Sequence, residues 1–420
     1  MAGYGPVDSG HDESSVEVGE ATAPDEDAAG PGARRWRKRD TGLIVLLVVV
    51  IAAAVAWFIQ LPYYALTPGA APDVAGLIHI EDGPHYHHTG SVHLVYVEET
   101  RIRALEWPFF KLDPNADIVP AGAVLGVETP AQYQTEGEID MSTAQQAATV
   151  VALQQLGYRV RVTPVGALVY GVFPGSPAEG QLNVGDVISR LDGKRVRTFS
   201  DLRLVLAHEI PGRVVHLVAG AFPDGHKRTI TIRLGVVRTT GPQQASCFPI
   251  GKGTKHPVIM AVTAKGGRPH AVACMGVYPQ GSGGPGIDGT AFHIGKLPVK
   301  VDLSSEGIVG PSAGLAFTLG LMQQLDPANL TNGYRIAATG TMSIDGSVGD
   351  VGGVAQKTVS VRDSGATVFF VPLQEYKIAE SKAGPGLHVY AVTNISQAIH
   401  DLESLGGQLQ KRSTTRLAGS

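Results

Sequence analysis

Cysteine is scarce in this 420-residue chain, which has only Cys247 and Cys274. So few cysteines exclude a disulfide-stapled mini-domain and a zinc fold built on cysteine ligands. An excess of one charge is also lacking, because 34 Lys and Arg stand against 38 Asp and Glu. That balance gives no indication of nucleic-acid binding. Hydrophobic residues make up 43% of the chain, which is enough for sizeable cores, and the length suggests two or three domains.

Lysine and arginine are absent from the first 33 positions, which carry eight acidic residues between Asp8 and Asp27. A segment with so little apolar surface cannot offset the entropy of ordering the chain, so residues 1–41 are predicted to be a disordered tail. Five of the six residues at 34–39 are basic. A nucleic-acid patch is one interpretation of them, but an apolar run follows directly.

The run from Gly42 to Ile59 contains no charged residue. About 20 apolar residues span a bilayer core, so we predict a transmembrane helix over residues 42–61. Basic residues flank only its N-terminal side, which places the tail in the cytoplasm and the rest of the chain outside. The alternatives are a buried core helix, which would be shorter or amphipathic, and a cleaved signal peptide, which rarely has so long a lead.

The two cysteines lie on the predicted outer, oxidising side of the membrane. A disulfide between Cys247 and Cys274 is therefore expected, with two isolated buried thiols as the alternative. Several histidines lie in residues 62–157, which form the predicted extracytoplasmic N-terminal region: His79, His85, His87, His88 and His93. Imidazole is a common metal ligand, but few acids lie nearby. We interpret the stretch as a solvated loop and predict no metal site.

Residues 158–237 alternate short β-type segments with turns, and a helix starts near Ser200 as its N-cap. The strings VFPGSPA, LNVGDVISRLDGKRV and FSDLRLVL follow one another here, and in this order they resemble a bacterial PDZ domain. The resemblance implies a groove that adds a peptide C-terminus as a strand. It would begin near Gly166, Ala167 and Leu168, whose N–H groups would hold the terminal carboxylate. A PDZ fold used only for packing is the alternative.

Residues 298–405 alternate strands with helices, as in an α/β domain. The string GPSAG at 310–314 leads directly into an apolar helix that follows the predicted strand Val299–Leu303. A serine at such a turn has an exposed Oγ, so Ser312 is a candidate nucleophile. Backbone N–H groups around Gly310, Pro311, Ser312 and Ala313 would suit an oxyanion.

A serine nucleophile needs a base, and a lysine whose pKa is depressed by burial can serve. Lys357 lies in the otherwise uncharged stretch 351–361, after the glycines at 352 and 353. Taken alone, a lysine early in a helix is usually solvated, and a GPSAG turn can simply start a helix.

Together, GPSAG and the pattern TG…GG-x-x-x-K resemble the proteolytic domain of Lon-type peptidases, family S16, over residues 298–405. That resemblance implies a Ser312–Lys357 dyad, with Thr339 orienting the lysine. With the PDZ-like region and the apolar helix, residues 42–405 resemble the membrane-anchored PDZ–Lon proteins of bacteria. The expected fold is an α/β Lon-type proteolytic domain plus a β-rich PDZ domain and one N-terminal transmembrane helix in a bacterial cell membrane.

The sequence departs from Lon proper in several places. It contains no GxxxxGK[ST] string, so no ATP-driven unfolding is expected. Val309 stands where classical Lon often has an acid three residues before the serine. The Gly-rich stretch 245–297 is unusually long; we include it in a Lon-like domain over 245–405, followed by a tail at 406–420, and consider it a candidate flap over the site.

These observations predict an ATP-independent serine endopeptidase without a cofactor, which cleaves unfolded or PDZ-presented proteins outside the cytoplasm. The resemblance also implies a homo-oligomeric ring such as a hexamer. GPSAG fits the nucleophile elbow of an α/β-hydrolase as well, with His388 or His400 as its histidine. The remaining alternative is a membrane-tethered PDZ adaptor with an inactive peptidase domain.

Overall fold

The computed structural model describes residues 38–126, 129–222, 225–239, 245–248, 273–278 and 289–410, with the backbone alone at 38–40, 237–239 and 245–248. The chain divides into two units, Met1–Val55 and Ala56–Ser420. The predicted disordered tail lies outside the described residues up to position 37, and the predicted C-terminal tail does so from position 411.

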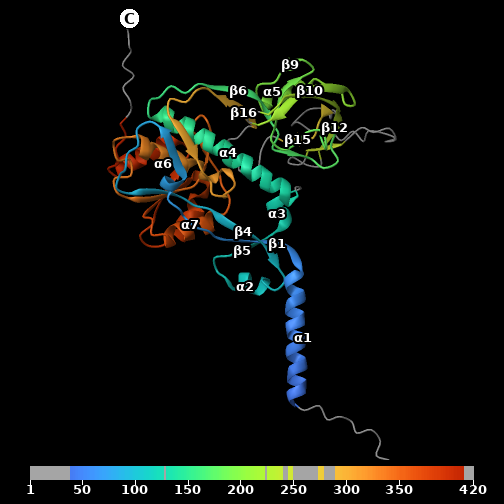
Figure 1. Cartoon of the computed structure of the whole chain (residues 1–420), viewed down its shortest axis with the longest axis vertical. Coiled ribbons are helices and arrows are strands. Elements are labelled where there is room, and N and C mark those ends of the chain that lie inside the picture. The colour runs from blue at the N-terminus through green and yellow to red at the C-terminus, as the bar shows by residue number, and fades with distance from the viewer. Residues whose placement is uncertain are drawn as a thin grey trace, which may run out of the picture. The chain divides into compact units, whose positions relative to one another are not determined.

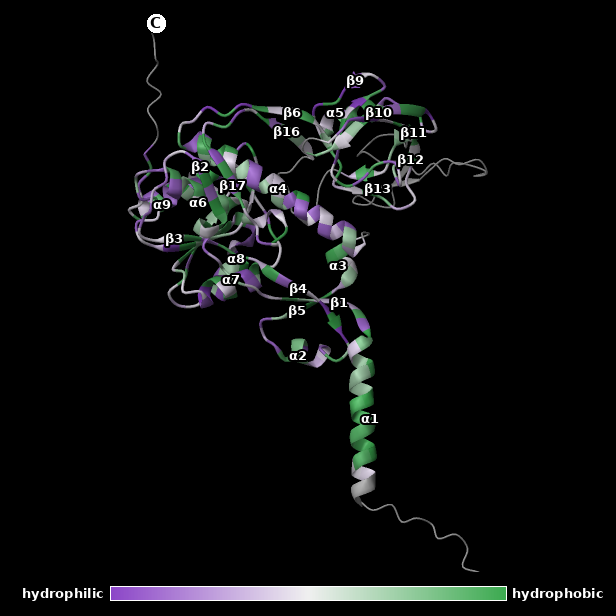
Figure 2. Ribbon diagram, in the orientation of Figure 1, coloured by the Kyte–Doolittle hydropathy of each residue, from purple (hydrophilic) through white to green (hydrophobic). Residues whose placement is uncertain are grey.

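Helix α1 (Lys38–Phe58) carries the predicted membrane segment. Its stretch Thr41–Phe58 has a mean hydropathy of 2.7 and no buried residue, so it is long and apolar enough to cross a membrane. The apolar character runs along nearly the whole helix (Figure 2). The helix ends at Phe58, three residues before the predicted limit of 61, because strand β1 (Gln60–Pro68) begins at Gln60.

A four-stranded parallel sheet forms the centre of the C-terminal part, in the order β22-β21-β18-β3. Its strands are β22 (His388–Val392), β21 (Val368–Pro372), β18 (Arg335–Ala338) and β3 (Ser91–Leu94). The edge strand β3 comes from the predicted N-terminal region, some 240 residues before its partner β18. The first and last soluble regions therefore share one sheet.

Alternate residues of this sheet enter two different cores, as the period of two along a strand requires. Ile336 and Phe370 join a cluster with helix α6 (Gly314–Leu325) and helix α9 (Ile395–Ser404). Ala337 and Phe369 join the opposite cluster with α7 (Val354–Asp363) and α8 (Tyr376–Ala383). The result is a three-layer α/β/α arrangement, with α6 and α7 on opposite sides of the sheet (Figure 1).

Helix α4 (Pro130–Gln155) packs against α6 and completes the first core. It starts twelve residues before the predicted Ser142. The Thr129 hydroxyl and the Gln132 side chain cap its first turn reciprocally, and Pro130 occupies its first position. Residues 62–157 are therefore part of the α/β fold rather than a separate domain.

The remaining elements of this part are short. Strand β1 is the centre of a sheet in the order β4-β1-β5, β2 pairs with β17, and β19 pairs with β20. Their bounds are β2 (Ile78–Asp82), β4 (Val97–Arg103), β5 (Asp117–Pro120), β17 (Lys300–Leu303), β19 (Thr341–Met342) and β20 (Val348–Gly349). The short helices are η1 (Val74–Leu77), α2 (Trp107–Leu112), α3 (Ala121–Leu125), η2 (Pro311–Ala313) and η3 (Leu373–Glu375).

The PDZ-like region is a second fold inserted into the first, with an antiparallel sheet in the order β11-β10-β8-β6-β16. Its strands are β6 (Val162–Leu168), β8 (Asp186–Leu191), β9 (Lys194–Arg195), β10 (Val214–Ala221), β11 (Arg228–Arg233) and β16 (Thr290–Ile294). Strands β6 and β16 also carry the chain into and out of this fold side by side (Figure 1).

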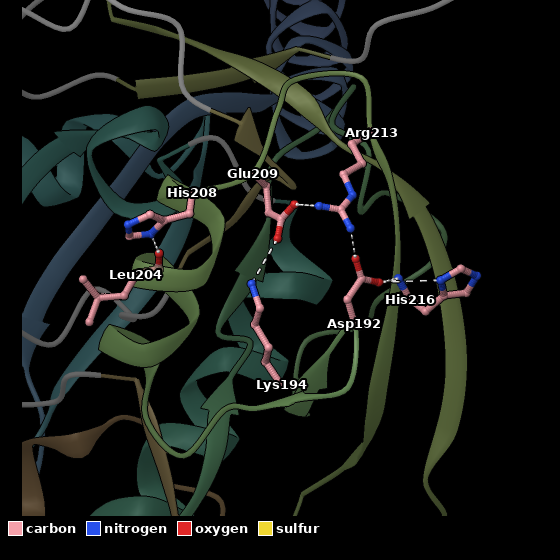
Figure 3. Close-up of polar contacts among 7 residues, drawn as sticks. All are labelled: Asp192, Lys194, Leu204, His208, Glu209, Arg213 and His216. Carbon is pink, nitrogen blue, oxygen red and sulfur yellow. Dashed lines mark hydrogen bonds and ion pairs between the residues drawn. The ribbon is translucent and has the colours of Figure 1, made fainter.

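Helix α5 (Phe199–Ala207) closes the PDZ core over Leu202. Its N-cap is Thr198, whose hydroxyl accepts a hydrogen bond from the Asp201 N–H, and not the predicted Ser200. Thr198 precedes an acid by three residues, which is the capping-box spacing. Beyond the helix, the exposed Arg213 bridges Asp192 and the buried Glu209, and Lys194 also approaches Glu209 (Figure 3).

The described parts of the stretch 245–297 join the PDZ fold, although we had included that stretch in the proteolytic domain. Strand β15 (Val277–Tyr278) pairs with β7 (Gly171–Val172), and β12 (Gly235–Thr239) lies between β13 (Ala245–Phe248) and β14 (Ala273–Cys274). Cys274 is disulfide-bonded. The side chain of Cys247, on β13, lies outside the described residues, so the expected pairing stays a prediction.

Candidate active site

A cleft of about 710 Å³ opens beside the GPSAG turn. Its walls come from β1, the N-terminal half of α4, the loop before Ser312 and the loop before α7. Ser312 and Lys357, which are 45 positions apart in the sequence, both line it. Folding therefore brings the two predicted catalytic side chains to one cavity.

Ser312 lies in η2, a single turn that leads into α6, and it is half-buried. Gly310 precedes that turn with φ +93°, a conformation that a side chain would disfavour. Gly314 follows it, and a Cβ there would lie 2.8 Å from the Cβ of Met342. The two glycines of GPSAG thus allow the sharp turn and the close approach of α6 to β19.

Only part of the predicted oxyanion site can donate. The Gly310 N–H donates to the Gly137 carbonyl of α4 at 2.8 Å, and Pro311 has no N–H. Of the four residues that we predicted, Ser312 and Ala313 keep N–H groups that could face an oxyanion. Our prediction considered the turn by itself, whereas a distant residue, Gly137 of α4, takes the Gly310 N–H.

Lys357 lies in the first turns of α7 and is 3% exposed. Burial lowers its pKa to about 8, while Glu375 and Glu99 raise it in part. A lysine with such a pKa carries a substantial neutral fraction near neutral pH, and a neutral amine can accept a proton. Its chemistry therefore suits a general base.

Thr339 connects the two predicted catalytic residues. The Lys357 ammonium donates to the Thr339 hydroxyl at 3.3 Å, and that hydroxyl donates to the Ser312 carbonyl at 3.3 Å. The next residue, Gly340, donates its N–H to the same carbonyl at 2.9 Å. The end of β18 thereby holds both the lysine amine and the backbone of the serine turn.

Several acidic and phenolic groups around the cleft were absent from our sequence prediction. The Tyr133 hydroxyl donates to Glu99 at 3.0 Å, and burial beside Glu99 raises the pKa of Tyr133. Glu375 accepts from the Val351 N–H at 3.2 Å, and burial raises the pKa of this carboxyl. The capping pattern at Thr129 could have placed Tyr133 on a helix, but no local pattern marks Glu375.

The predicted PDZ groove is not an open edge. Strand β6, which carries Gly166, Ala167 and Leu168, pairs with β8 on one side and with β16 on the other. The Leu168 N–H donates to the Gly289 carbonyl at 2.7 Å. A peptide cannot add at these residues while β16 is paired, because the chain's own return strand takes that edge.

Three histidines from the sequence analysis, His93, His388 and His400, can be located in the structure. His93 is buried on β3, not in a loop, where its Nδ1 contacts the Ala71 carbonyl at 2.7 Å and its Nε2 contacts the Ser91 hydroxyl. Burial lowers its pKa. Within the described ranges, no group of three His, Cys, Asp or Glu residues is arranged to hold a metal ion. His388 and His400 are both exposed, and neither lines the cleft beside Ser312.

Comparison with known proteins identifies two domains. The PDZ domain family matches residues 149–219, and the Lon protease (S16) C-terminal proteolytic domain matches residues 286–401. In solved structures, the PDZ domain of the SdrC-like protein from Listeria monocytogenes is 23% identical over 18% of this chain and 76% of its own, with a TM-score of 0.17.

Curated relatives match short parts of this chain. "Lon protease" of Malacoplasma penetrans is 35% identical over 92 residues, which are 21% of this chain and 11% of that protein. "Lon protease 2" of Bacillus subtilis is 30% identical over 95 residues, 23% of this chain and 17% of its own. The chain thus spans less than a fifth of the length of these relatives. It nevertheless carries a PDZ domain and the C-terminal proteolytic domain of the Lon family.

Proposed function

We propose that this protein is an ATP-independent serine endopeptidase, anchored by α1 in a bacterial cell membrane and facing outward, with Ser312 and Lys357 as its catalytic dyad. One observation carries the proposal. The buried Lys357 lines the same cleft as Ser312, with a pKa lowered to about 8, and Thr339 contacts both residues.

The reaction follows from these groups. Neutral Lys357 accepts the proton of the Ser312 hydroxyl, and Oγ attacks the carbonyl carbon of a peptide bond. The N–H groups of Ser312 and Ala313 stabilise the oxyanion. The protonated lysine then gives its proton to the leaving amine, and water hydrolyses the acyl-enzyme by the same route in reverse. Thr339 keeps the amine directed at the serine.

The substrate class follows from what the chain contains. No ATP-binding string accompanies the proteolytic domain in the printed sequence, so substrates would be unfolded, flexible or delivered by the PDZ domain. Protein or peptide partners fit both domains. We retain a homo-oligomeric ring as part of the proposal, by analogy with Lon-type domains.

The test is degradation of casein without ATP by the full-length chain in detergent. Wild type should cleave it, whereas Ser312→Ala and Lys357→Ala should each lose at least about a thousandfold in rate, since the dyad works as a unit. Ser381→Ala and Lys382→Ala are matched controls, because both residues are exposed on α8. Retention of most activity in Lys357→Ala would overturn the dyad.

The two alternatives predict different results in the same assay. An α/β-hydrolase would lose activity in His388→Ala or His400→Ala, which the dyad leaves unchanged. An adaptor would bind peptides without cleaving them in any variant. Among the described residues that line the cleft there is no histidine, which favours the dyad over the hydrolase.

A further inference from the structure

Helix α2 (Trp107–Leu112) exposes apolar side chains that contribute to no core. None of its residues is buried. Leu112 and Phe109 are 83% and 72% exposed, the largest fractions among the large apolar side chains described beyond α1. They are three positions apart, so one face of the helix presents both. A single exposed leucine is ordinary, but two such side chains on one short helix indicate a surface that something covers.

The chain fixes this helix beside the end of the apolar segment. The Ala104 N–H, three residues before α2, donates to the Ile59 carbonyl at 2.9 Å. The Arg103 guanidinium lies 4.2 Å from the centre of the Trp57 ring. These two contacts hold the approach to α2 at the level of residues 57–59, where the apolar segment ends.

A third contact joins α2 to strand β1. The Trp107 ring, at the start of α2, packs edge-on against Tyr63 of β1, with centroids 5.1 Å apart. Figure 1 shows α2 close to β1 and β5. The side chains of Trp57, Tyr63 and Trp107 therefore gather where the chain leaves the apolar helix. Trp and Tyr are the residues that concentrate at membrane–water interfaces, because their rings are amphipathic.

We infer that α2 is a second membrane attachment, in which Phe109 and Leu112 enter the lipid interface beside the outer end of α1. The inference rests on the proposed membrane anchor. Its occupant is the bilayer itself, because α2 is tied to residues that adjoin the proposed span. Lys111, exposed in the last turn, suits lipid phosphates while its methylene stem lies along the apolar layer.

The consequence is orientation. A domain held by one helix can swivel about that helix, whereas a second attachment restricts the swivel. Strand β1, which starts at the anchor, also lines the catalytic cleft through Tyr64 and Leu66. With α2 attached, the mouth of the cleft therefore keeps a constant orientation to the membrane.

The test uses the full-length chain in nanodiscs of phosphatidylcholine and phosphatidylglycerol. Phe109→Cys carries a nitroxide, and its accessibility to oxygen and to a nickel chelate is measured by power saturation. Leu204→Cys is the matched control, because Leu204 is 63% exposed on α5 of the PDZ fold (Figure 3). Leu47→Cys reports on α1. The chain without an added cysteine is treated with the same nitroxide reagent, and its signal gives the background from Cys247 and Cys274.

Oxygen should reach the label at position 109 several-fold better than the nickel chelate does, as at position 47, with the opposite order at position 204. A label at 109 that behaves like the one at 204, while 47 stays in the bilayer, overturns the inference alone. So does a label at 109 that neither reagent reaches, because protein then covers it. Chelate access at position 47 instead overturns the proposed anchor, and the inference with it.

A paired substitution checks the result from the other side. Phe109→Ser with Leu112→Ser should raise the access of the nickel chelate to a nitroxide at Lys111→Cys, because α2 then leaves the lipid interface, while the chain stays in the nanodisc through α1. Leu204→Ser is the control and should leave the label at 111 unchanged. An unchanged label at 111 in the double variant contradicts attachment through these two side chains.

Discussion

Lys357 combines two properties that a solvated lysine lacks: it is almost fully buried, and it shares the hydroxyl of Thr339 as a partner with the turn of Ser312. Its pKa of about 8 implies that the neutral fraction rises about tenfold per pH unit below that value. We expect kcat/KM for a small fluorogenic peptide to rise with that slope from pH 6 and to level off near pH 9. A plateau already at pH 7 would point to another base.

The same burial carries a cost in stability. Because the folded-state pKa is depressed from 10.5, the native chain holds fewer protons than the unfolded chain between about pH 8 and 10.5. The loss of stability from burying the charged amine is therefore fully present below pH 8, and it is relieved as pH rises toward 10.5. Lys357→Met, which is similar in length and apolar, should be more stable by roughly 1–3 kcal/mol at pH 7.

That gain should shrink toward pH 10, and it is measured by thermal unfolding of the detergent-solubilised chain. Lys382→Met on the surface of α8 is the control and should change little at either pH. A gain for Lys357→Met that stays constant between pH 7 and pH 10 would contradict a lowered pKa of Lys357 in the native chain.

Among the elements, α5 offers a direct comparison between two candidate caps. Thr198 accepts from the Asp201 N–H at 3.0 Å, whereas Ser200 is an exposed residue inside the helix. Thr198→Ala should cost about 1 kcal/mol of PDZ stability, while Ser200→Ala should stay within about 0.5 kcal/mol. Hydrogen exchange of the α5 amides measures both. Equal losses in the two variants would refute the assignment of the cap.

Prediction from the sequence succeeded for elements whose signals are local. The strings around Ser312 and Lys357 mark their turns and helices within a few residues, so the serine turn and the helix of the lysine were predicted correctly. The start of α4 was missed, although Thr129, Pro130 and Gln132 carry the capping pattern. That pattern precedes polar residues, and our prediction followed the apolar face that begins after Ser142.

Features that depend on distant pairing could not be predicted. A loop was predicted around His93 from the sequence, and nothing local indicates that β3 pairs with β18, because parallel partners share no local signal. Glu375 follows β21 in the chain, and it comes near the loop before α7 through tertiary contacts such as its bond to the Val351 N–H. For the same reason, the predicted free edge at Gly166–Leu168 was wrong: the strand that takes it, β16, follows more than 120 residues later.

At the scale of the whole molecule, the PDZ fold is an insertion with adjacent ends. Pro164 and Phe292 are paired across β6 and β16. Replacing residues 165–291 by an Asn-Gly turn should therefore leave the α/β unit folded, with a single cooperative thermal transition. Val92→Asp, which places a charge at a buried position of β3, should abolish that transition. Loss of the transition in the excised chain would show that the two folds depend on each other.

Helix α4 has a mechanical consequence. The Gly137 carbonyl accepts from the Gly310 N–H ahead of Ser312, and Ile139, two residues later, packs against the Leu168 and Tyr170 cluster of the PDZ fold. Two residues of a helix are about 3 Å of stiff rod. A displacement of the PDZ fold would therefore be transmitted through α4 to the turn of Ser312, which couples the position of the PDZ fold to the geometry of the proposed nucleophile.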